Sequence, residues 1–505
     1  KGTQKGISTD ANGKYSITAA EGNTLVFRYL GYKAHEAVVG AAATIDVVLQ
    51  EENNSLNEVV VTALGIKREK KSLGYAVQEV KGESLVQARE PNLVNTLSGK
   101  VAGLQVTRSS NGPAGSSKIT LRGNNSLTGD NQPLIVVDGV PLNNFTGAAN
   151  NDYWNPSLDM GNGMSDINAE DIESVSVLKG PASAALYGSR AGNGAILITT
   201  KSGKMQKGLG ITVSSSLGIE SPFSGPAMQN SFGQGTDGQF ANNSSQSWGP
   251  KADGQMIENW NGQQVPLSTY DNIGNYFDQG ISSNQSISFQ QQYKNTSVYS
   301  SFNRLDDKSM IPGTKLSRTN LMARAVSKFG KDDRWTVDTK VQYSNSNARN
   351  RPLGGANVNN SFYTMYMLPR SLDIRQFSEG SQFVGGQNNM IWYGGGSQIN
   401  PYWGSQNNLN QDVRDRFIMN GSVKYQFNDW LNAEVKAGAD TYYTNTETKV
   451  YGGSPLTSTG RYSLGKQTFT ETNYSFLMVA AKDNLFGKLG GSASIGGNIM
   501  QQKGT

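Results

Sequence analysis

Side chains that could carry catalysis are scarce in this chain of 505 residues. It contains no cysteine and one histidine, so disulfides, thiolate metal sites and thiol nucleophiles are excluded. The histidine, His35, lies in a strand-like stretch where a surface position is expected. A carboxylate pair is the remaining route to hydrolysis, but Asp306-Asp307 and Asp332-Asp333 fall in stretches that predict loops or turns. We therefore expect neither an enzyme nor a resident metal or cofactor.

Aromatic side chains offer binding chemistry instead. Two long stretches between predicted strands, 220–283 and 344–414, contain Trp248, Trp260, Trp392, Tyr393, Tyr402 and Trp403. Their rings could stack on sugars or accept peptide side chains. Alternatively they anchor the loops to which they belong, and the sequence alone leaves both interpretations open.

A short β-branched run could bind a protein partner. It follows a polar linker and consists of Glu58, Val59, Val60, Val61 and Thr62. A run so short and so isolated is typical of an extended segment that adds as a strand to another protein's sheet. The alternative is an ordinary edge strand of the next domain.

Composition narrows the class of protein further. Hydrophobic residues make up 36% of the chain and no run approaches the ~20 apolar residues of a spanning helix, so any membrane role must use strands. The net charge of +5 is dilute and its lysines and arginines are scattered. We therefore expect no nucleic-acid partner.

The elements that position these residues divide into three parts. Residues 1–50 predict a small β-sandwich, with strands at 15–18, 24–30, 35–39 and 44–49 and its first strand missing. Residues 51–66 form a linker. Residues 67–203 predict a mixed α/β domain, with strands at 134–137, 173–178 and 194–200 and a helix at 182–187 that ends at Gly188.

Residues 204–505 change to strands and loops only. Nine strands are predicted, near 209–219, 284–292, 297–304, 319–329, 335–343, 415–427, 430–443, 467–482 and 489–501. The connections between them alternate strictly between long and short. Long structureless connections count against a compact soluble domain, whereas a transmembrane barrel has short turns at one rim and long loops at the other.

The hairpin at 418–440 shows the same preference. Apolar residues alternate with polar ones on both of its strands, so one face is apolar and the other charged. Trp335 and Trp430 lie beside short turns, where interfacial aromatic girdles belong. We expect the apolar face to contact lipid, and surfaces carrying Val341, Val423 and Val435 to be free of covering protein.

The length of the third part indicates an incomplete barrel. Nine strands in residues 204–505 correspond to roughly 34 residues per strand, and a plugged transporter has about 22 strands. At this spacing the whole barrel would need roughly 740 residues. We expect the natural sequence to continue beyond Thr505.

Several separate motifs carry a family resemblance. In order along the chain they are LSGKVAGLQV from Leu97, ITLRG from Ile119, PLIVVDGVP from Pro133, DIESV from Asp171, LKGP from Leu178 and LYGSRAGNG from Leu186. Together these motifs resemble the plug domain of TonB-dependent transporters. The preceding sandwich resembles the carboxypeptidase-regulatory-like domain, and the pairing is similar to the SusC-like (RagA-like) branch.

The resemblance implies active import across the cell outer membrane by a multi-pass barrel. Residues 58–62 would be the TonB box, pulled by the periplasmic partner TonB. A SusD-like surface lipoprotein would share the cargo, a glycan or an oligopeptide. Arg122 and Lys179 match plug positions that face acidic residues of the barrel wall in the family; Lys179 replaces the more usual arginine, and local pairing within the plug is the alternative.

A second reading stays open at this stage. A secreted β-rich adhesin or glycan-binding protein would also be mainly β. It would purify without detergent and would not need alternating long and short connections.

Overall fold

The computed structural model describes residues 6–10, 12–29, 32–42, 44–50, 59–61, 67–69, 77–87, 89–127, 131–145, 152–154, 156–180, 182–395, 398–486 and 489–505. The chain forms two compact units, one comprising 1–60 with 67–73 and the other 61–66 with 74–505. Each unit is described by itself below.

Among its described residues, the first unit contains an antiparallel pair of strands. Strands β1 (Thr24–Phe27) and β2 (His35–Val38) form it, and Tyr15 packs edge-on against Phe27 with ring centroids 5.2 Å apart. The other two predicted strands, at 15–18 and 44–49, are not assigned as strands among the described residues. They lack the continuous ladder of backbone hydrogen bonds that defines a strand. His35 is exposed, as expected.

The predicted partner-binding run coincides with strand β3 (Val59–Val61), which pairs with β4 (Lys67–Glu69). Glu58 and Thr62 lie outside the described residues.

The second unit begins with an α/β domain, called here the globular domain (residues 77–203). Its five-stranded sheet has the order β5-β10-β11-β8-β9 and comprises β5 (Val77–Lys81), β10 (Ile172–Leu178), β11 (Ala195–Thr200), β8 (Leu134–Val137) and β9 (Val140–Leu142). Strands β8 and β11 run parallel and the other pairs antiparallel. A separate pair joins β6 (Leu104–Arg108) to β7 (Ser117–Leu121).

Short helices complete the globular domain: α1 (Gly82–Leu85), α2 (Leu93–Thr96) and α3 (Ala182–Tyr187). The predicted strand, helix, strand order of β10, α3 and β11 is confirmed. Gly188 ends α3 with a φ of 73°, a left-handed conformation that glycine adopts without steric cost, and its N–H donates to the carbonyl of Ala184. The apolar core lies between the sheet and α1 and α2.

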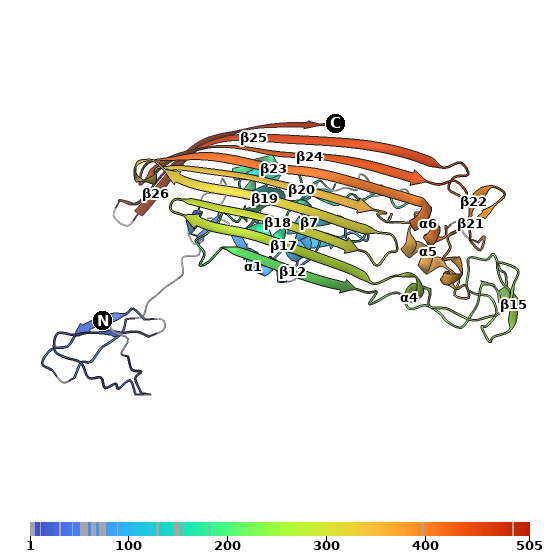
Figure 1. Ribbon diagram of the computed structural model, residues 1–505, viewed down its shortest axis with the longest axis horizontal. Coiled ribbons are helices and arrows are strands. Elements are labelled where there is room, and N and C mark those ends of the chain that lie inside the picture. Colours follow the sequence, from blue (N-terminus) through green and yellow to red (C-terminus); the bar gives the residue numbers. More distant parts are fainter. Residues whose placement is uncertain are drawn as a thin grey trace. The chain divides into compact units, whose positions relative to one another are not determined.

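A nine-stranded antiparallel sheet, called here the wall, curves around the globular domain (Figure 1). Its strands follow chain order and are β12 (Ile211–Glu220), β17 (Gly280–Tyr293), β18 (Thr296–Lys308), β19 (Lys315–Phe329), β20 (Trp335–Arg349), β23 (Asn408–Asn428), β24 (Leu431–Val450), β25 (Arg461–Phe486) and β26 (Leu489–Gly504). All nine predicted strands are confirmed, and several extend well beyond the predicted bounds.

Short turns gather at one end of the wall and long connections at the other (Figure 1). The long connections are not structureless, and this part of the prediction was wrong. They contain the hairpins β13 (Gly235–Thr236) with β14 (Gln239–Phe240), β15 (Met256–Glu258) with β16 (Gln264–Pro266) and β21 (Ser381–Val384) with β22 (Gln387–Met390), and the helices α4 (Asn272–Tyr276), α5 (Ser361–Met367) and α6 (Pro401–Asn407). The helices α4, α5 and α6 contribute to an apolar core within these connections, which residues far apart in sequence supply.

The paired aspartates need one further correction. Asp306 and Asp307 lie within β18 rather than in a loop, on opposite faces of the strand, so they do not form a carboxylate pair. Asp332 and Asp333 lie in a turn, as predicted.

Within the described residues no helix has both the length and the apolar character to cross a membrane.

Candidate functional site: the interface between the globular domain and the wall

The inward face of the wall contacts the globular domain directly. Ile418 on β23 belongs to the domain's own apolar core. Opposite β9, a Cβ atom built on Gly438 of β24 would lie 2.2 Å from Cγ2 of Val140. Such a separation is far below van der Waals contact, so only glycine at 438 lets Val140 approach the wall.

Arg416 on β23 is the most heavily bonded side chain at this interface. Its guanidinium forms two hydrogen bonds to the Asp440 carboxylate of β24, at 2.8 and 2.7 Å, and lies 3.2 Å from Asp166 of the globular domain. It also donates to the backbone carbonyls of Gly163 and Asn143, at 2.8 and 2.9 Å. Arg416, Asp440 and Asp166 are all buried. The hydrogen bonds and ion pairs among them offset the free energy lost when their charges leave water.

Two further arginines bind the backbone of the globular domain. Arg351 forms an ion pair with Asp412 of the wall and donates to the carbonyls of Ala114 and Asp159. Arg414 donates to the carbonyl of Met160 at 3.0 Å. A backbone carbonyl accepts hydrogen bonds whatever side chain the residue carries. These contacts therefore hold the backbone at Ala114, Asp159 and Met160 in place without requiring particular side chains there.

Asp138 carries a second buried charge cluster. Its carboxylate accepts from the N–H and hydroxyl of Thr200 in the globular domain, and from Lys340 and Arg324 of the wall at 2.5 and 3.1 Å. Burial alone would raise the pKa of Asp138, but the two cations outweigh it and hold that pKa below its ordinary value. The same balance applies to Asp166, whose pKa is lowered by Arg414 and Arg416 despite burial.

Two more contacts lie elsewhere on the interface. Arg190 forms a bidentate pair with Glu471 of β25, at 3.1 Å for both bonds. The hydroxyl of Tyr299 on β18 donates to Asp171 at 2.9 Å. Burial raises the pKa of Asp171, and hydrogen bonds offset only part of this. Asp171 is therefore the one buried aspartate of the three whose charge is disfavoured here.

Neither sequence-predicted lock residue reaches a wall carboxylate among the described residues. Lys179 donates to Gln78 of the globular domain at 2.8 Å, and burial and the neighbouring Arg122 lower its pKa. Arg122 is exposed, with a φ of 59° and its N–H bonded to the carbonyl of Gly103. Local pairing within the domain describes Lys179 in this structure, and a locking role for either residue stays a prediction.

Sequence reasoning missed the residues that do join the domain to the wall. A signal was present, because Asp412, Arg414 and Arg416 occupy every second position of one strand and so share one face. Asp166, which binds Arg416, lies 250 residues away in the sequence. No pattern in the sequence around Asp166 predicts this contact.

The aromatic candidates of the long connections are distributed unevenly. Tyr393 is buried in the loop core, Trp403 is fully buried on α6, and Trp260, Trp392 and Tyr402 pack against the loop core. Loop anchoring therefore describes these five in this structure. Trp248 is 59% exposed and contacts Phe232, with ring centroids 5.9 Å apart. Ligand contact by any of the six stays a prediction.

The outward face of the wall is apolar and uncovered by the described chain. Its exposed large side chains on the seven inner strands of the sheet include Ile287, Val298, Phe302, Leu321, Val341, Phe417, Met419, Val423 and Val435. At the end with short turns, Trp335 packs against Tyr425 and Phe329. A continuous apolar face of this extent marks an interaction surface rather than a water-exposed one.

Comparison with protein families identifies two domains. Residues 69–195 match the TonB-dependent Receptor Plug Domain and residues 1–61 match the CarboxypepD_reg-like domain.

Among curated proteins, TonB-dependent receptor P26 of Formosa agariphila is 41% identical over 204 residues, covering 40% of this chain and 19% of that protein. TonB-dependent receptor SusC of Bacteroides thetaiotaomicron is 29% identical over 359 residues, covering 70% of this chain and 33% of that protein. The chain thus spans between about a fifth and a third of the length of these relatives. Both are receptors rather than enzymes.

A solved structure of the RagAB peptide importer has the same fold. It superposes with a TM-score of 0.66 at 21% sequence identity, covering 88% of this chain and 49% of that one. At this identity the likeness concerns the fold alone.

Proposed function

We propose that this chain is part of a SusC-like TonB-dependent transporter that imports nutrients across the outer membrane, with the globular domain as the plug of a lipid-embedded barrel. The matches to the plug domain and to TonB-dependent receptors P26 and SusC support this proposal. In the closed state the plug is held against the inward face of the wall by the buried contacts of Arg416, Asp138 and Arg190. Cargo passes when those contacts are rearranged.

One observation carries this proposal: a single sheet has a polar, ion-paired face toward the plug and an apolar, exposed face on the other side. Soluble proteins place large apolar side chains inside and charges outside. The wall reverses this arrangement, as expected where lipid contacts one face and a wet or plugged lumen the other.

The energy for rearrangement would come from TonB. Val59–Val61 is already extended in β3, and an extended segment can add to a partner's sheet through backbone hydrogen bonds. β5 is the first strand of the plug after this segment and lies at an edge of the plug sheet, so it has one neighbour, β10, to separate from.

Further partners and the cargo are proposed from the family. A SusD-like lipoprotein would cover the end that carries the long connections. The cargo would be a glycan or an oligopeptide, and the neutral amide and tryptophan surface around Trp392 suits either.

The test is deletion of residues 58–62 in the full-length protein. Uptake of the nutrient on which the strain depends should be abolished, whereas ligand binding at the cell surface should change little. Replacing the nearby polar linker residues 52–56 with Gly-Ser of equal length is the matched control and should leave uptake intact. Unimpaired uptake after the deletion would remove the energy-coupling assignment.

A further inference from the structure

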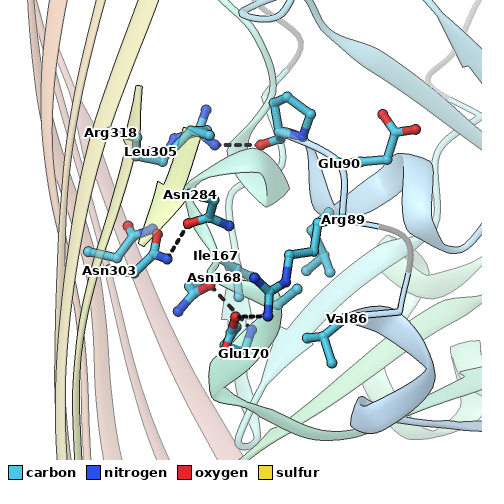
Figure 2. A pocket seen from close by; sticks show the side chains of 14 residues that line it. Val86, Arg89, Glu90, Ile167, Asn168, Glu170, Asn284, Asn303, Leu305 and Arg318 are labelled. Carbon is cyan, nitrogen blue, oxygen red and sulfur yellow. Dashed lines mark hydrogen bonds and ion pairs between the residues drawn. The ribbon is translucent and has the colours of Figure 1, made fainter. Parts of the chain in front are cut away.

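A polar pocket lies between the plug and the wall, at a place that the proposed function does not assign. It is lined on the plug side by residues from 86–93 and 167–170, and on the wall side by Asn284, Asn303, Leu305, Arg318 and Asn320 (Figure 2). The space that the centre of a water-sized sphere can occupy in it is about 30 Å³, and the pocket is partly open to solvent. This is room for one end group of a ligand.

Arg318 on β19 brings a positive charge into this pocket. Its side chain is only 5% exposed, and its Nη1 atom donates to the carbonyl of Pro91 at 2.7 Å. Its Nε atom has no hydrogen-bond partner within the part of the chain that the structure describes. A buried guanidinium donor without an acceptor is costly, so an acceptor is expected to bind there.

The neighbouring carboxylates are already engaged. Glu170 pairs with Arg89 at 2.7 Å, as Figure 2 shows, and Glu90 pairs with Arg108. Asp166 and Asp307 both attract Arg318 from a distance, and Asp166 is held by Arg414 and Arg416. Among the described residues no carboxylate forms an ion pair with Arg318.

The side-chain amide of Asn320 adds a hydrogen-bond acceptor to the pocket. Asn320 lies two residues from Arg318 on the same face of β19, and its Oδ1 is buried without a described partner. Asn168 lies across the pocket, and its side-chain amide interacts with the carboxylate of Asp171. A bound group is therefore offered one donor, Arg318 Nε, and one acceptor, Asn320 Oδ1.

We propose that this pocket binds a carboxylate group of the cargo, a group whose two oxygens match a guanidinium edge and which lies beside an N–H or O–H donor. The proposal rests on the proposed import function, since the carboxylate belongs to the transported molecule. Two sources share this chemistry: a uronic acid, with its ring hydroxyls, and a peptide C-terminus, with its amide N–H. Arg318 would then select cargo by charge at the boundary between plug and wall.

Calorimetric titration of the purified full-length protein in detergent tests this. One pair of probes is D-glucuronate and D-glucose; the other is N-acetylalanine and N-acetylalaninamide. The acidic member of at least one pair should bind about tenfold or more tightly than its neutral counterpart, because a hydrogen-bonded charge is worth at least that factor. Preference in the first pair alone identifies an acidic sugar, and in the second alone a peptide terminus.

Variants connect the preference to the pocket. R318Q should abolish it, and R304Q, at an exposed arginine of β18 already paired with Asp306, should keep it. N320D leaves Arg318 in place and supplies an internal carboxylate, so it should also abolish the preference, and being isosteric it guards against misfolding of R318Q. Equal binding of acidic and neutral probes by the unaltered protein, or a preference that survives both R318Q and N320D, would overturn the proposal. Binding is measured without TonB, so this outcome is independent of whether uptake requires residues 58–62.

Discussion

The two faces of the wall differ in chemical character, one being polar and buried and the other apolar and exposed. On β23, Arg414 and Arg416 point inward and are almost fully buried, whereas Met419 and Val423 point outward and remain exposed. Neighbouring positions of one strand thus meet opposite surroundings. The inward face resembles a polar protein interface, and the outward face requires a solvent that is itself apolar.

The two faces are also stabilised by different interactions. The inward face is held by specific partners, such as Asp440 and Asp166 around Arg416, and loses stability when one of them is removed. The apolar side chains of the outward face, such as Met419 and Val423, cannot form hydrogen bonds or ion pairs and depend on transfer into hydrocarbon. Each of the following changes acts on one face and leaves the other intact.

Covalent attachment of the plug to the wall should have the largest effect. A Cβ at 438 would lie 3.1 Å from the Cβ of Val140, slightly less than the separation of about 3.5–4.5 Å in disulfides, so a small shift of β9 from the wall should let the V140C/G438C variant form the bond on oxidation. Uptake should fall to background when oxidised and recover with reductant. These 505 residues contain no native cysteine. The V140C single variant and the reduced double variant serve as controls; full uptake by the oxidised double variant would show that cargo passes without moving β9 from the wall.

Removing the central arginine should come next. R416A leaves Asp440 and Asp166 buried without it and should lower the free energy of unfolding by about 3–5 kcal/mol. The matched control is R304A, which breaks the exposed pair with Asp306 and should cost less than about 1 kcal/mol. Chemical unfolding in detergent gives both values, and similar losses for the two variants would contradict the picture of a specifically bonded inward face.

A charge on the outward face should have a smaller effect that depends on lipid. V341R places arginine on β20 at a position that is 50% exposed, and should cost ~2–4 kcal/mol in a bilayer if it lies near the midplane. V48R changes an exposed valine of the first unit and should cost under about 0.5 kcal/mol. Folding into vesicles is the measurement; equal, negligible costs for both would mean that water contacts Val341.

Lowering the pH should have the smallest effect, and it should weaken only the contacts of the inward face. Because the folded-state pKa values of Asp138 and Asp166 are lowered by wall cations, their contribution is fully present above pH ~4 and is lost as the pH falls further through the folded values. Proteolysis of the plug in the assembled protein should therefore be constant from neutral pH to about pH 5 and increase below about pH 4. A change centred between pH 6 and 8 would require a different group.

The sequence predicted one face of the wall better than the other. Alternation of Met419, Gly421 and Val423 is local, and so it revealed both the strands and the apolar face. The inward contacts depend on pairs such as Val140 with Gly438 or Asp166 with Arg416, which neither alternation nor turn chemistry can detect. The lock was therefore predicted at Arg122 and Lys179, while the structure makes its plug–wall ion pairs through other residues.

The long connections were misread for a similar reason. Their core forms from positions as distant as Tyr276 and Ser361, whose hydroxyls lie 3.0 Å apart. No single segment of these connections contains enough apolar residues to predict a core from the sequence. The strands were also predicted too short, since β23–β25 continue as polar ribbons beyond the alternating part.

Spin labels at two adjacent positions of β23 test the central claim most directly. In the full-length protein reconstituted into vesicles, a label on V423C should be relaxed strongly by oxygen and weakly by a water-soluble nickel chelate, because lipid contacts that face. A label on S422C, one residue away on the buried inward face, should be shielded from oxygen. A label at 423 that is shielded from both reagents, or reached by the nickel chelate, would contradict the account.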